Sequence, residues 1–151
     1  AESVLAVKGM LEGLVQCSQS SSGAVRKGGV SALSALCQHP TSVAILARAD
    51  VARRALTPAV RADDGTDLSR RCAVQAAMGL AFLCTASTET LDDTPPHALE
   101  VLQRVLLSAC GGERFGGVKY KPIDVFPPLT LLTAADAHKP RVATAPVPAV
   151  L

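Results

Sequence analysis

Two segments of this chain, residues 25–37 (VRKGGVSALSALC) and 72–84 (CAVQAAMGLAFLC), have apolar or small residues at the same six positions, 0, 4, 7, 8, 11 and 12. Those positions lie on one face of an α-helix. One segment starts at residue 25 and the other at residue 72, so the spacing is 47 residues. The middle of each face carries small residues, namely Gly29 and Ala32 in the first and Ala76 and Gly79 in the second. The repeat therefore predicts two equivalent helices that neighbouring helices approach closely.

A second helical pattern lies before each of these segments. Apolar residues fall at steps 0, 3, 4, 7 and 8 within residues 7–15, and residues 51–56 repeat the last four of these steps. Leu99, Leu102 and Leu106 suggest a third copy. Asp67 and Thr94 are natural N-caps, and Pro95 suits the first helical position. The low aromatic content, 3 % with no Trp, predicts a core of Ala, Leu and Val.

These residues resemble the armadillo (ARM) repeat family, with HEAT repeats as the near alternative. The stretch ILARADVARRAL (45–56) resembles a short first helix, a small-residue corner and a second helix, and VKGMLEGLV (7–15) resembles the same corner. The two segments of the 47-residue repeat resemble the third ARM helix. The resemblance covers roughly residues 4–110 and implies an all-α, right-handed solenoid segment of about two and a half repeats, assigned to residues 1–110, with a concave surface.

Residues 111–151 break the pattern. Six of the ten prolines lie in the last 30 residues, which predicts an extended Gly/Pro-rich tail with room for one short helix at 128–139. Its three aromatic residues are Phe115, Tyr120 and Phe126. An extended segment with aromatic residues can bind another protein, or it can cover the last helix of its own solenoid. Both alternatives remain open at this point.

A candidate partner-binding ridge follows from the second segment of the repeat. Met78 and Phe82 are four residues apart, off the core face, and would form an apolar ridge lined by Arg71, Gln75 and Thr85. The alternative is that both pack on the next helix. In armadillo proteins of nuclear import the third helix presents Trp and, four residues later, Asn. The matching positions here are Ser31 and Ala35 in one copy and Met78 and Phe82 in the other, so neither copy keeps that pair.

Arginines cluster in the middle of the chain and suggest a patch for an acidic partner, composed of Arg48, Arg53, Arg54, Arg61 and Arg70. The alternative is a solvated face balanced by nearby aspartates. The segment DDGTD (63–67) is interpreted as a helix-capping turn because it lacks the ligand spacing of a calcium loop. The segment GGERFGG (111–117) follows a helix and lacks the Lys-Ser or Lys-Thr of a phosphate-binding loop. No cofactor or metal is predicted.

The five cysteines form no close pair, and their odd number predicts free thiols in a reducing, cytoplasmic setting. Their spacings match no zinc pattern, so they are interpreted as small buried hydrophobic residues and not as ligands or nucleophiles. The net charge of +2 calls for neither nucleic acid nor a membrane surface, and no apolar run approaches the roughly 18–20 residues of a membrane span. The first residues already read as helix, which suggests a segment of a longer chain.

These features predict a non-enzymatic protein–protein interaction scaffold, a segment of a larger armadillo-type subunit that binds other subunits. Cytoskeletal or ciliary assemblies are hosts suggested by analogy of fold alone. The alternatives are a peptide-capturing adaptor or transport receptor and, third, an enzyme with a reactive thiol.

Overall fold

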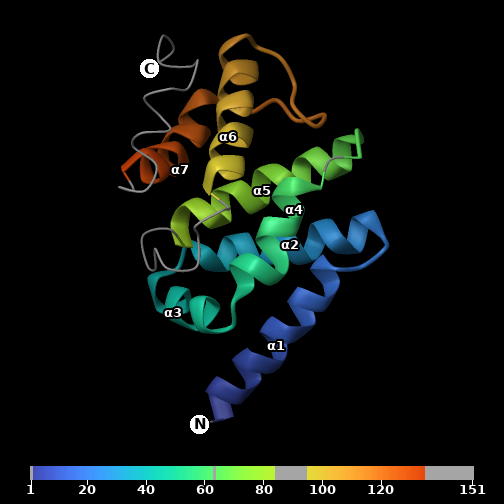
Figure 1. Ribbon diagram of the computed structural model, residues 1–151, viewed down its shortest axis with the longest axis vertical. Helices are drawn as coiled ribbons and strands as arrows, with labels where there is room; N and C mark the ends of the chain where they lie inside the picture. The colour runs from blue at the N-terminus through green and yellow to red at the C-terminus, as the bar shows by residue number, and fades with distance from the viewer. Residues whose placement is uncertain (1, 63, 84–94, 135–151) are drawn as a thin grey trace.

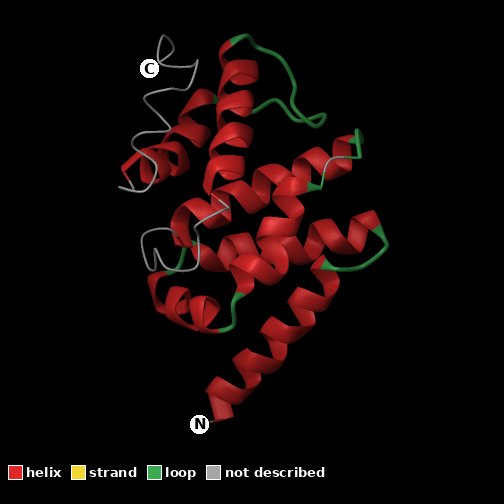
Figure 2. Ribbon diagram, in the orientation of Figure 1, coloured by secondary structure: helices red, strands yellow, loops and turns green. Residues whose placement is uncertain are grey.

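The computed structural model of the chain describes residues 2–62, 64–83 and 95–134. Helices dominate this part, and none of its residues forms a β-strand (Figure 2). The elements are α1 (Glu2–Ser18), α2 (Gly23–Cys37), α3 (Pro40–Arg48), a π-helix (Ala52–Leu56), α4 (Thr57–Arg61), α5 (Asp67–Leu83), α6 (Pro95–Cys110) and α7 (Pro122–Ala134). The all-α prediction is confirmed, and the 47-residue repeat corresponds to α2 and α5.

Helices α2 and α5 lie side by side at the centre of the molecule (Figure 1). Helix α1 packs on α2, while α4, α6 and α7 pack on α5. The largest fully buried side chains are Leu33, Leu46, Leu56, Leu80, Leu102, Leu106, Leu132, Val15, Val30, Val51, Val74 and Val105. All of these are Leu or Val, as the composition predicts.

Small residues set the distances between these helices. A Cβ atom added to Gly29 of α2 would lie 2.7 Å from the backbone nitrogen of Ser18 and 2.8 Å from the carbonyl oxygen of Leu14, both on α1. A Cβ atom added to Gly79 of α5 would lie 2.9 Å from Oγ of Ser34 on α2. That hydroxyl donates a hydrogen bond to the carbonyl of Gln75 at 2.5 Å. The predicted close approach at these glycines is confirmed.

The π-helix is explained by Pro58, which lies just after it in the chain. Pro58 has no N–H, so the carbonyl of Arg54 loses the partner that a regular helix would supply. Gln19 at the end of α1 donates its amide Nε2 to that carbonyl at 3.2 Å. The Arg54 guanidinium also donates to both carboxylate oxygens of Glu12, at 2.8 and 2.7 Å. Arg54 therefore joins α1 to the π-helix through its backbone and its side chain.

The turn before α5 is a capping turn, as predicted, but the cap is displaced by one residue. Thr66 Oγ1 accepts the backbone N–H of Ser69 at 3.1 Å, so Thr66 caps the helix and Asp67 is its first residue. Asp64 Oδ1 in turn accepts the N–H of Thr66 at 2.9 Å. Helix α6 begins at Pro95 as expected, and Thr94 lies outside the described residues.

Helix α7 corrects the prediction of an extended tail. It begins at residue 122, six residues before the short helix predicted at 128–139. Pro127 and Pro128 lie inside it and leave the carbonyls of Ile123 and Asp124 without helical partners, but both residues are exposed to water. The opposite face packs on α5 and α6 through the buried residues Val125, Pro128, Leu129 and Leu132. This apolar stripe, at steps 0, 3, 4 and 7, outweighs the two lost hydrogen bonds.

The contact at Gly29 gives a direct test of the helix packing. Gly29→Ala should lower the free energy of unfolding by roughly 1–3 kcal/mol, because the new methyl group overlaps the backbone of α1. Gly28→Ala is the matched control in the same helix, since its added Cβ meets no atom within 4 Å. This substitution should raise the free energy of unfolding by about 0.5–1 kcal/mol through helix propensity. Urea unfolding measures both, and equal stabilisation by the two substitutions would contradict the close approach of α1 and α2.

Candidate functional site

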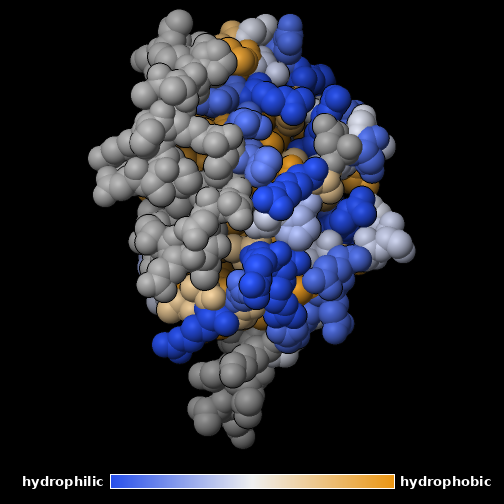
Figure 3. Space-filling view, viewed as in Figure 1, coloured by the Kyte–Doolittle hydropathy of each residue, from blue (hydrophilic) through white to orange (hydrophobic). Residues whose placement is uncertain are grey.

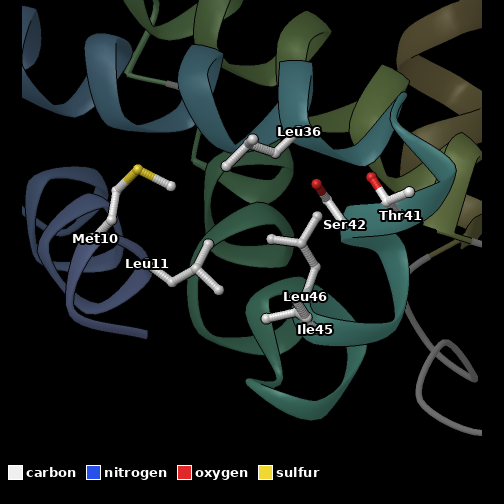
Figure 4. A pocket seen from close by; sticks show the side chains of 7 residues that line it. All are labelled: Met10, Leu11, Leu36, Thr41, Ser42, Ile45 and Leu46. Atoms are coloured by element: carbon white, nitrogen blue, oxygen red, sulfur yellow. The ribbon is translucent and has the colours of Figure 1, made fainter. Parts of the chain in front are cut away.

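An open pocket of about 280 Å³ lies between α1, α2 and α3 (Figure 4). Its lining comprises Met10, Leu11, Leu36, Thr41, Ser42, Ile45 and Leu46. Helix α1 supplies the first two, α2 supplies Leu36, and α3 supplies the rest. The pocket thus forms where helices that are distant in sequence come together.

The pocket has a fixed base and an accessible edge. Leu11 and Leu46 are buried in the hydrophobic core, so the base cannot move without disturbing the fold. Met10 has 48 % of its surface exposed, and its flexible thioether chain adapts readily to different shapes. Thr41 and Ser42 carry their hydroxyl groups on the side nearest α2 (Figure 4).

The lining favours binding over chemistry. Five of its seven side chains are apolar, and the other two are hydroxyls without an acid, base or thiol among the lining residues. A hydroxyl needs a general base close by to act as a nucleophile. The volume lies just below the roughly 300–1,000 Å³ of pockets that enclose small molecules. The pocket is therefore best suited to an apolar side chain inserted from outside.

The predicted ridge on α5 is only partly accessible. Arg71, Gln75, Met78 and Phe82 are all half-buried. Met78 and Phe82 pack against the chain's own core, which favours the packing alternative for both. Arg71 donates its Nε–H to the carbonyl of Gly116 at 2.6 Å. Thr85 lies outside the described residues.

The three aromatic residues of the predicted tail have different surroundings. Phe115 is 8 % exposed, belongs to the core, and lies under the Arg104 guanidinium, 5.3 Å from its ring centroid. Tyr120 is half-buried against the same core. Phe126, on α7, is 41 % exposed. Phe115 is thus held by its own chain and is not available to a partner, whereas Phe126 is.

The five arginines of the predicted acidic-partner patch do not form one surface. Arg53 pairs with Asp50 at 2.5 Å, and Arg54 pairs with Glu12. The hydrogen bond from Arg54 holds the pKa of the Glu12 carboxyl below its ordinary value. The exposed residues Arg48 and Arg61 end α3 and α4. Arg70 lies near the start of α5, on the opposite side of the molecule from α3 (Figure 1).

The thiols differ in accessibility. Cys37 and Cys72 are buried, as predicted, whereas Cys17 is half-buried. Burial raises the pKa of the Cys37 thiol to about 12 and also raises the pKa of Cys72. Cys110 is exposed, which corrects the prediction of burial for that residue, because it lies on the solvent side of the last turn of α6. Cys84 lies outside the described residues.

Comparison with known proteins adds no family, since no protein-family model, no curated protein and no solved structure matches this chain. The armadillo resemblance therefore stays a prediction. None of the described helices combines the length and apolar character required to cross a membrane. Within residues 2–62, 64–83 and 95–134, no three His, Cys, Asp or Glu side chains gather as a metal site would require.

The sequence pattern did not reveal the pocket. In the sequence, the apolar residues of the pocket cannot be told apart from residues on the core face of a helix. Met10 and Leu11, for example, belong to the apolar face predicted for residues 7–15. Thr41 and Ser42, directly after the helix-starting Pro40, were the only polar signal, and two hydroxyls at a helix start are usual. Only the packing of α1 and α3 on α2 makes these residues neighbours.

The buried thiol predicts a pH dependence of stability. Above about pH 9 the unfolded chain ionises Cys37, while the folded chain keeps the proton until about pH 12. The unfolded state then binds fewer protons, so stability falls as pH rises through this window, by about 1.4 kcal/mol per pH unit at most. Chemical unfolding from pH 8 to 10.5 should show this slope. Cys37→Ala should reduce the slope, and the exposed Cys110→Ala should not. Identical slopes in the wild type and both variants would refute the assignment.

Proposed function

We propose that this chain is a non-enzymatic scaffold of helical repeats, of armadillo or HEAT type, that binds other protein subunits. The observation that carries the proposal is the open apolar pocket between α1, α2 and α3, with the half-exposed Met10 at its edge. An accessible apolar cavity beside an adaptable side chain is typical of a surface that receives an anchor residue from a partner.

A partner helix is the occupant that fits best. Amphipathic helices insert apolar side chains into hydrophobic depressions between helices, with anchors spaced three or four residues apart. Three helices form the walls here, and a buried core fixes the base, so little has to be ordered on binding. The hydroxyls of Thr41 and Ser42 can bond polar groups beside the inserted side chain.

The two alternatives have weaker support. A peptide-capturing receptor of the nuclear-import kind would need the Trp–Asn pair, which neither α2 nor α5 carries. A thiol enzyme would need a reactive cysteine, yet burial suppresses ionisation of Cys37 and Cys72. The cytoplasmic place of the scaffold is inferred from the odd number of its cysteines, which form no close pair in the sequence, and a cytoskeletal or ciliary assembly is suggested by analogy of fold alone.

Selection from a displayed random-peptide library tests the proposal with the full chain immobilised. Enriched peptides should carry apolar residues three or four positions apart. Met10→Asp should weaken their binding by roughly 1–3 kcal/mol, because it places a charge at the edge of the pocket.

Val25→Asp is the matched control. Val25 is 45 % exposed, close to the 48 % of Met10, and does not line the pocket. Peptides that bind Met10→Asp as tightly as the wild type, or that lose binding equally to both variants, would exclude the pocket as the binding site. Circular dichroism should show the same helix content in all three proteins.

A further inference from the structure

The loop between α6 and α7 folds back on the start of α5. Arg71 donates its Nε–H to the carbonyl of Gly116 at 2.6 Å. A Cβ atom added to Gly116 would lie 3.1 Å from the Asp67 carbonyl and 3.2 Å from the Arg71 nitrogen. Gly116 and Gly117 have φ values of +60° and +78°, which a side chain would oppose. Glycine thus allows the loop to lie directly on the first turns of α5.

Six cationic residues belong to the loop and to the helices that it contacts. They are Arg70 and Arg71 on α5, Arg104 on α6, and Arg114, Lys119 and Lys121 in the loop. Residues 67–71 and 104–121 contain two carboxylates, Asp67 and Glu113, and Glu100 and Asp124 lie just outside these ranges, so six cationic residues face four carboxylates in this region. The ion pairs found within the described part of the chain, Arg53–Asp50 and Arg54–Glu12, involve none of the six. Figure 3 shows strongly hydrophilic side chains at the upper right of the molecule, where the α6–α7 loop lies in Figure 1.

The arginines are positioned by neutral groups. Arg71 binds the Gly116 carbonyl, and Arg114 donates an Nη1–H to the Gly117 carbonyl at 3.1 Å. Arg104 lies over the Phe115 ring. The Nε atom of Arg70 is buried and has no hydrogen-bond partner. These contacts hold Arg71, Arg104 and Arg114 in place without an ion pair, although the Asp67 carboxylate and the Arg71 guanidinium both lie beside Gly117.

The lysines complete the surface on the loop. The segment between the Phe115–Val118 bridge and α7 has no helical structure, and within it Tyr120 is half-buried while Lys119 and Lys121 are exposed. Alternate residues of an extended chain point to opposite sides, so the packing of Tyr120 turns both lysines to solvent.

We propose that these six residues form a basic surface that binds an acidic peptide segment of a partner protein. The proposal goes beyond the apolar pocket, which is built from other helices and recognises different chemistry. Guanidinium groups held in place recognise carboxylates through paired hydrogen bonds. Single-stranded nucleic acid is disfavoured because its bases stack on exposed aromatic rings, and the two rings of the α6–α7 loop are covered, since Phe115 is buried and Tyr120 is half-buried.

Fluorescence anisotropy with a short oligoglutamate peptide and the full chain tests the proposal. The triple variant Arg114→Gln/Lys119→Gln/Lys121→Gln should bind the peptide about tenfold more weakly, and added salt should weaken binding to the wild type. The double variant Lys119→Gln/Lys121→Gln leaves the Arg114 contact intact and should show a smaller loss. Circular dichroism confirms that each variant is folded.

The matched control is Arg48→Gln/Arg53→Gln/Arg61→Gln, which removes the same charge from exposed positions outside the basic surface. It should leave peptide binding within about twofold of the wild type. Equal weakening by both triple variants would overturn the proposal, because overall charge would then explain binding. Tighter binding of an oligonucleotide of equal charge, lost in the first triple variant, would also overturn it.

Discussion

The close approach of helix backbones at Gly29 and Gly79 determines how this molecule packs. A chain with 3 % aromatic residues cannot fill wide gaps between helices with large rings, so interior density must come from short distances between backbones. Because Gly29 has no side chain, α1 can lie against α2. Because Gly79 has none, Ser34 of α2 can lie against α5. Because α4, α6, α7 and the α6–α7 loop all rest on α5, their positions depend on these two contacts.

The features that follow from local rules could be predicted from the sequence. The 3.6-residue period gave α2 and α5, and Pro95 marked the start of α6. The short helix predicted at 128–139 overlaps the second half of α7, but the first half was not predicted because its prolines argue against a helix, whereas tertiary packing decides there. Val125, Leu129 and Leu132 gain burial against α5 and α6 that no local rule includes. Helix α5 is capped by Thr66 and not by the predicted Asp67. Thr and Asp are both good N-caps, so local rules do not decide between two such neighbours.

The candidate surfaces could not be predicted because they join residues that are far apart in the chain. Met10 and Ile45 line one pocket only because α1 and α3 both pack near α2. The sequence also cannot show which charges are already neutralised. Arg54 belonged to the predicted patch, yet its guanidinium is paired with Glu12. Arg114 was not part of that patch, and it makes no ion pair with the described residues. Charge counts thus become informative only once the pairing is known.

The pocket and the basic surface lie at opposite ends of the longest axis of the described structure, with α1 and α3 at one end and the α6–α7 loop at the other (Figure 1). They share no residue, and the tightly packed helices α2 and α5 lie between them. A partner at one surface therefore leaves the other accessible, and the core holds the two at a fixed separation. The surfaces also differ in chemistry, since mostly apolar side chains line the pocket whereas Arg and Lys form the basic surface. The proposed scaffold function needs this combination, because two different partners can then bind at once without competing.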